Sequence, residues 1–119
     1  DKERIRHAYN VKTSKEVPVL DSIEEITEVI NTLKKEHKKA RHIAWAYVLS
    51  SPLTEKFSDD GEPNGTAGRP ILNVLQKQGK KDCLVAVVRY FGGIKLGAGG
   101  LVRAYTKATV ESLTTEDKK

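Results

Sequence analysis

The sequence has 119 residues, of which 38% are hydrophobic and 31% charged. These values predict one globular domain with its own hydrophobic core and exclude a disordered chain or two ordinary domains. No apolar run approaches the ~18 residues that a membrane helix requires, and a single cysteine excludes an internal disulfide. We therefore expect a cytoplasmic protein that does not enter a membrane.

Charge is unevenly distributed along the chain. Lysine and arginine number 21 against 16 acidic residues, which gives a net charge of +5. The segment Lys77–Lys107 is rich in basic residues, whereas Glu55–Glu62 is mostly acidic. A basic surface of this kind suits an acidic partner, although a solvated helix face explains many such runs equally well.

The first half of the chain predicts a strand, a helix and a second strand. Ile5–Val11 mixes apolar and polar positions over a strand-like length. A helix over 22–37 begins at Ser22, which forms a capping box with Glu25. The segment His42–Leu49 then alternates large and small residues, as a strand does.

The second half begins with a polar loop, Ser50–Gly68, that contains two turn-forming Asx-Gly pairs. A helix over 70–78 follows, with a proline at its first position. The nearly continuous apolar run Cys83–Phe91 predicts a strand buried on both faces. A last helix covers 100–113, and 114–119 form a polar tail that we expect to fray.

The resulting order, β-α-β-α-β-α, predicts an α/β two-layer (α+β) domain. We expect a small mixed sheet, with the strand around Val85–Val88 at its centre and all three helices packed on one face.

The polar loop places three carboxylates close together, on Asp59, Asp60 and Glu62. Such a cluster can bind a divalent cation, but the spacing is not that of an EF-hand. We favour a turn whose aspartates cap backbone N–H groups. Gly65, Thr66 and Gly68 complete this loop.

A second loop joins the buried strand to the last helix and is rich in glycine. A helix N-terminus presents unsatisfied N–H groups, and glycines allow an anion to approach the backbone closely. The predicted site for a phosphate or nucleic acid therefore consists of Arg89, Gly92, Gly93, Lys95, Gly97, Gly99, Gly100 and Arg103. Two alternatives stay open: the glycines only form tight turns, or the acidic loop pairs with these cations.

Other polar residues predict no chemistry. His42 at the start of a strand and Cys83 in an apolar run are interpreted as packed residues. We assign no catalytic residue, no metal ligand and no cofactor.

Two segments carry a family resemblance. The residues 58–68, Ser-Asp-Asp-Gly-Glu-Pro-Asn-Gly-Thr-Ala-Gly, are followed by Arg-Tyr-Phe-Gly-Gly-Ile-Lys-Leu-Gly-Ala-Gly-Gly-Leu-Val-Arg-Ala-Tyr over 89–105. Together they resemble the Impact family, also called the YigZ family, in its bacterial form. Asn64 stands where serine is common in that family. The resemblance extends more weakly from about Ile5 to Leu113.

This resemblance implies the N-terminal domain of that family over residues 1–113, without its first strand, and a fold similar to ribosomal protein S5 domain 2. It implies a non-enzymatic module that binds RNA or the ribosome and modulates translation. One alternative is a protein that regulates stress-kinase signalling through a protein partner. Another is an enzyme acting on a phosphorylated small molecule. The sequence does not predict an oligomeric state.

Overall fold

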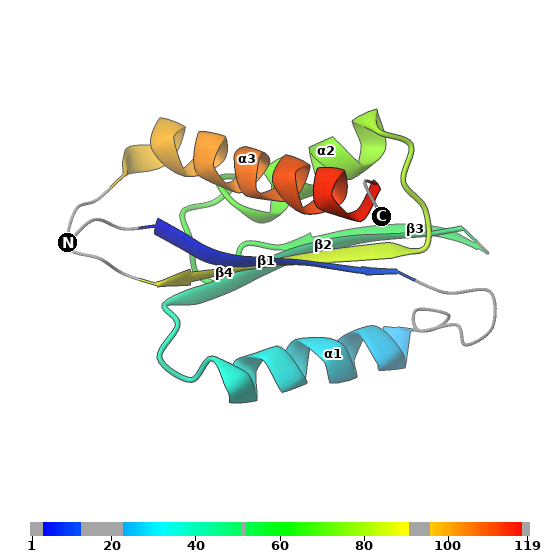
Figure 1. Ribbon diagram of the computed structural model, residues 1–119, viewed down its shortest axis with the longest axis horizontal. Coiled ribbons are helices and arrows are strands. Elements are labelled where there is room, and N and C mark those ends of the chain that lie inside the picture. Colours follow the sequence, from blue (N-terminus) through cyan, green and yellow to red (C-terminus); the bar gives the residue numbers. More distant parts are fainter. Residues whose placement is uncertain (1–3, 13–22, 51, 91–95, 118–119) are drawn as a thin grey trace.

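A computed structural model of the chain describes residues 4–12, 23–50, 52–90 and 96–117 (Figure 1). In chain order the elements are β1 (Arg4–Lys12), α1 (Ile23–Glu36), β2 (His42–Ser50), β3 (Leu53–Ser58), α2 (Gly68–Lys77), β4 (Cys83–Tyr90) and α3 (Gly97–Asp117).

The strands form one sheet in the order β1-β4-β2-β3, and each neighbouring pair is antiparallel. The predicted central strand is confirmed, because β4 lies between two strands and Val85–Val88 are fully buried. The prediction of a mixed sheet is wrong. The sequence indicated a loop where β3 forms, and β3 reverses the chain before α2, so that β4 returns antiparallel to β2.

The α+β class is confirmed, but the expected placement of three helices on one face is wrong. Figure 1 shows α1 on one side of the sheet and α2 with α3 on the other. The central strands require this arrangement, because both faces of β2 and β4 are apolar and each must be covered. The structure is therefore three layers deep, with the sheet in the middle.

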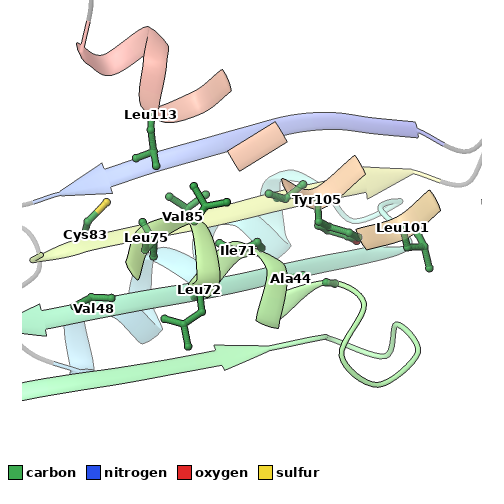
Figure 2. Packing of buried hydrophobic residues seen from close by; sticks show 14 residues of the cluster. Ala44, Val48, Ile71, Leu72, Leu75, Cys83, Val85, Leu101, Tyr105 and Leu113 are labelled. Atoms are coloured by element: carbon green, nitrogen blue, oxygen red, sulfur yellow. The ribbon is translucent and has the colours of Figure 1, made fainter. Parts of the chain in front are cut away.

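The face toward α2 and α3 carries the larger hydrophobic cluster (Figure 2). Figure 2 shows Ile71 and Leu75 of α2 close to Val85 of β4, with Tyr105 of α3 beside them. The opposite face packs Ile26 and other apolar residues of α1 against the sheet. The sheet residues on that second face are Ile43, Tyr47, Leu49, Leu84, Ala86 and Val88.

Element boundaries differ from the predictions by a few residues. The helices predicted over 22–37 and 70–78 form as Ile23–Glu36 and Gly68–Lys77. Ser22 of the expected capping box lies outside the described residues. The last helix starts three residues earlier than predicted, at Gly97, and continues to Asp117 through most of the expected tail. None of the described helices has the length and hydropathy needed to cross a membrane.

Candidate functional site

The loop between β3 and α2 is organised by the carboxylate of Asp59. Its Oδ1 accepts hydrogen bonds from the backbone N–H groups of Ala67 (3.2 Å) and Gly68 (2.8 Å). Its Oδ2 accepts a third from the N–H of Gly65, at 3.0 Å. These N–H groups lie at and before the start of α2, where a helix has unsatisfied donors. The predicted capping role is confirmed for Asp59.

Asp60 ties the same loop to the start of β2. Its Oδ2 accepts a hydrogen bond from the N–H of Ile43 (2.7 Å), and its backbone carbonyl lies 2.7 Å from Nδ1 of His42. Asp60 has a positive φ of 47°, and Gly61 follows at 86°. The Asp-Gly pair therefore makes the turn that the sequence indicates.

Thr66 and Gly68 close the loop against the sheet. The hydroxyl of Thr66 donates to the carbonyl of Pro63 at 2.6 Å. A Cβ on Gly68 would lie only 2.6 Å from the carbonyl oxygen of Ser58, so any larger residue would collide with backbone there. The glycine is required because two chain segments pass this close.

Glu62 is the buried centre of a polar cluster, which we call the Glu62 cluster: His42, Glu62, Arg89 and Tyr105. Only 2% of the Glu62 side chain is exposed. Its carboxylate accepts hydrogen bonds from Nε and Nη2 of Arg89, the latter at 2.9 Å. The hydroxyl of Tyr105 donates to Oε2 at 2.6 Å, and Nε2 of His42 lies 3.5 Å from Oε1.

The electrostatics of the Glu62 cluster favour a fixed ion pair. A buried carboxylate is stable in the charged form only when paired and hydrogen-bonded, and the two-pronged contact with a guanidinium provides both. Burial, and then the hydrogen bond to Glu62, raise the pKa of Tyr105, which keeps its hydroxyl as a neutral donor. The cluster joins the acidic loop, β2, the end of β4 and α3 at one point.

This arrangement changes the role of Arg89. The sequence places Arg89 in an anion site but leaves open that the acidic loop pairs with the cations. The second alternative holds for Arg89, which is 4% exposed and bound to Glu62. Arg89 is therefore directed inward and not toward an external ligand.

The described part of the glycine loop lies in α3 itself. Gly97 has a φ of 75° and begins the helix, and Gly99 and Gly100 belong to the first turn. Arg103 is exposed one turn later, with Nη1 3.5 Å from where a Cβ on Gly99 would be. The other predicted members, Gly92, Gly93 and Lys95, lie outside the described residues.

The charged side chains of α2, and of α3 up to residue 110, are all basic. No acidic residue occurs in Gly68–Lys77 or in 97–110. Four exposed cations occupy these segments: Arg69, Lys77, Arg103 and Lys107. We call this surface the basic face. Within the described residues, no group of three histidine, cysteine or acidic side chains is placed to hold a metal ion.

The Impact N-terminal domain model matches residues 8–113, which is most of the chain and includes both loops. The chain belongs to the Impact family. It is 53% identical over 91 residues to the IMPACT family member YvyE of Bacillus subtilis, covering 76% of this chain and 42% of that protein. It is 40% identical over 117 residues to the IMPACT family member YigZ of Escherichia coli, covering 91% of this chain and 57% of that protein.

A more distant match is the Protein IMPACT homolog of Dictyostelium discoideum, at 34% identity over 84 residues. The fold matches a solved structure described as "Crystal structure of an hypothetical protein", with a TM-score of 0.77 and 34% identity. That match covers 95% of this chain and 60% of the other. The chain thus spans between two and three fifths of the two bacterial relatives and of this neighbour.

The Impact motifs bring together residues that the sequence alone did not join. The sequence indicates a packed residue at His42 and places Tyr105 on the inward side of the last helix, yet both side chains contact Glu62. One signal was available: Arg89 is the only charged residue in the apolar run Cys83–Phe91. A charge in a strand buried on both faces needs a buried partner, and the nearest acidic motif is the loop of Glu62.

Proposed function

We propose that this Impact domain is a non-enzymatic, cytoplasmic module that binds RNA, free or within the ribosome, and thereby modulates translation. The observation that carries the proposal is the basic face, where Arg69, Lys77, Arg103 and Lys107 are exposed without an acidic neighbour in their segments. Phosphate contacts from lysine and arginine provide most of the sequence-independent affinity for nucleic acid. Membership of the Impact family supports a regulatory or translation-related role in broad terms.

The start of α3 supports the same proposal. Gly97, Gly99 and Gly100 present no side chain beyond a hydrogen, so a phosphate can approach the N–H groups of the first turn. Arg103 follows on the same helix and supplies a full charge. Lys95 is included in the proposed site on the basis of the sequence. Arg89 is not, because it binds Glu62.

A protein partner is the second candidate, and one observation favours it. Val102 and Val110 are each 38% exposed on α3, on the helix that carries Arg103 and Lys107. Exposed apolar side chains contribute little to binding phosphates but do contribute to binding a protein.

Salt dependence separates the two candidates. We expect affinity for a single-stranded RNA oligonucleotide to fall steeply between about 50 and 200 mM salt. Arg103→Glu and Lys107→Glu should each weaken binding and reduce the slope of log affinity against log salt by roughly 0.7. Lys35→Glu is the matched control, since Lys35 is an exposed lysine on α1, across the sheet.

The melting temperature of each variant shows whether the fold is intact. If the two α3 variants bind RNA like the Lys35→Glu variant, the basic face is not the binding surface and the proposal is wrong. A single saturable protein complex with little salt dependence would favour the second candidate.

A further inference from the structure

The strand β3 lies at the edge of the sheet. It pairs with β2 on one side, and no other strand among the described residues pairs with it. Figure 1 shows β3 as an outer strand, at the opposite edge from β1. Alternate backbone N–H and C=O groups of an edge strand point away from the sheet and can pair with another extended chain.

The side chains of β3 give this edge a defined pattern. Leu53 is 65% exposed and Phe57 is 39% exposed, and Glu55 lies exposed between them. Alternate residues of a strand share a face, so these three side chains form an apolar–acidic–apolar row. The row is on the α2 side, because Glu55 Oε1 accepts a hydrogen bond from Nε2 of Gln76 at 2.8 Å.

Phe57 agrees with this placement, since its ring lies 5.8 Å from the guanidinium carbon of Arg69 on α2. Lys56 belongs to the other face of the strand, because its partner on β2 is Tyr47, which packs toward α1. A partner strand would therefore find Leu53, Glu55 and Phe57 together beside α2.

A second copy of the chain is a poor occupant of this edge. In a symmetric antiparallel pair of two β3 strands, residues directly opposite each other lie on the same face of the joined sheet. Leu53, Glu55 and Phe57 of one copy can therefore be opposite only these positions of the other copy, and Lys56 only residues of the other face. The register that sets Leu53 opposite Phe57 of the other copy also sets Glu55 opposite Glu55. Moving the twofold axis by one residue, which shifts the register by two, sets Lys56 opposite Lys56. Like charges directly opposite each other destabilise a strand pair. The registers centred on Glu55 and on Lys56 are therefore both unfavourable for a dimer.

We propose that β3 binds an extended segment of another protein by strand addition, and that this segment has the pattern apolar–x–basic–x–apolar. Backbone hydrogen bonds along β3 provide the affinity. The apolar positions cover Leu53 and Phe57, and the basic residue pairs with Glu55, whose carboxylate has acceptor capacity beyond the bond to Gln76. The proposal does not depend on RNA binding, because the basic face belongs to α2 and α3.

A charge-swap experiment tests the pairing at Glu55. The probes are two ten-residue peptides with Val-Thr-Lys-Thr-Val or Val-Thr-Glu-Thr-Val at the centre, titrated by fluorescence anisotropy. We expect the chain to prefer the Lys peptide by roughly fivefold or more, and Glu55→Lys to reverse that preference. Hydrogen exchange at saturating Lys peptide should slow at backbone amides of residues 53–58 and stay unchanged in α1.

A second pair of variants tests the apolar contacts. Leu53→Ser removes the apolar contact without adding a charge, so it should weaken both peptides by about the same factor while leaving the melting temperature unchanged, because Leu53 is largely exposed. Asn31→Ser is the control, an exposed uncharged residue on α1, and it should leave peptide binding unchanged. Equal affinity for the two peptides, or unchanged exchange along β3 at saturation, overturns the proposal. A concentration-dependent dimer protected at β3 would show that a second copy occupies the edge and would also overturn it.

Discussion

On the α1 side of the sheet, the exposed helix surface carries both acidic and basic side chains, among them Glu24, Glu28, Lys35 and Glu36. On the other side, the exposed charges of α2 and of α3 up to residue 110 are all basic, and a buried ion pair joins the loop to the sheet. Both sides bury apolar residues of the same two central strands. The difference therefore lies in polar chemistry, and it indicates that α1 supports the sheet while the other side carries the candidate site.

The largest expected loss of stability comes from changing the central strand β4, which both sides of the sheet share. Val87 and Val88 are fully buried on opposite faces of β4. Val87→Asp and Val88→Asp should each unfold the domain, because a buried, unpaired carboxylate costs more than the domain's marginal stability. Circular dichroism checks this, with Val110→Asp as an exposed control. A folded Val88→Asp variant would show that α1 does not exclude water from the sheet face that it covers.

The next effect distinguishes the two sides. Glu62→Leu should lower the free energy of unfolding by about 3–5 kcal/mol, since it removes the carboxylate that neutralises the buried Arg89. Adding Arg89→Met should recover most of that loss, because an apolar pair can replace a buried ion pair. Urea denaturation measures both. On the α1 side, Ile26→Ala should cost about 2–5 kcal/mol with no second-site recovery of this kind.

A smaller effect tests the loop. Asp59→Ala should cost about 1–2 kcal/mol, because the N–H groups of Gly65, Ala67 and Gly68 lose their acceptor. Glu28→Ala, an exposed acidic residue on α1, should change stability by less than about 0.5 kcal/mol. Equal effects on thermal denaturation would mean that the carboxylate of Asp59 does not hold the loop.

The smallest expected loss of stability near neutral pH comes from removing the hydroxyl of Tyr105. Tyr105→Phe should cost about 1 kcal/mol, because the carboxylate of Glu62 loses one donor. The pKa of Tyr105 is raised in the folded state, so above pH 10 the unfolded chain loses this proton while the folded chain retains it. The contribution of Tyr105 to the free energy of unfolding is therefore fully present below pH 10. It falls as the pH rises further, by up to about 1.4 kcal/mol per pH unit.

Denaturation at pH 9 and pH 11 checks the sign. The Tyr105→Phe variant should lose less stability over that interval than the parent chain. Tyr47, on the α1 side, also has a pKa raised by burial but has no carboxylate contributing to the shift. Tyr47→Phe should therefore reduce the alkaline loss by less. A larger change for Tyr47→Phe would contradict the special role of the Glu62 cluster.

Much of the fold could be predicted from the sequence, because local patterns report local structure. The periodicity of Ile26, Ile30 and Leu33 predicts α1, and the unbroken run of apolar residues predicts a central β4. The strand β3 escaped prediction because an exposed edge strand with polar side chains resembles a loop. That single omission also explains the wrong expectation of a mixed sheet.

The candidate site divides in the same way. The two motifs, the capping role of Asp59 and the resemblance to the Impact family follow from the sequence, since turn residues and glycines act through their immediate neighbours. Only the tertiary structure decides that Arg89 faces Glu62 and not an external anion. Those residues lie 27 positions apart, and Tyr105 lies 43 from Glu62. Side-chain pairing across such separations depends on how strands and helices stack, because no local preference of the chain encodes which buried charge will meet which.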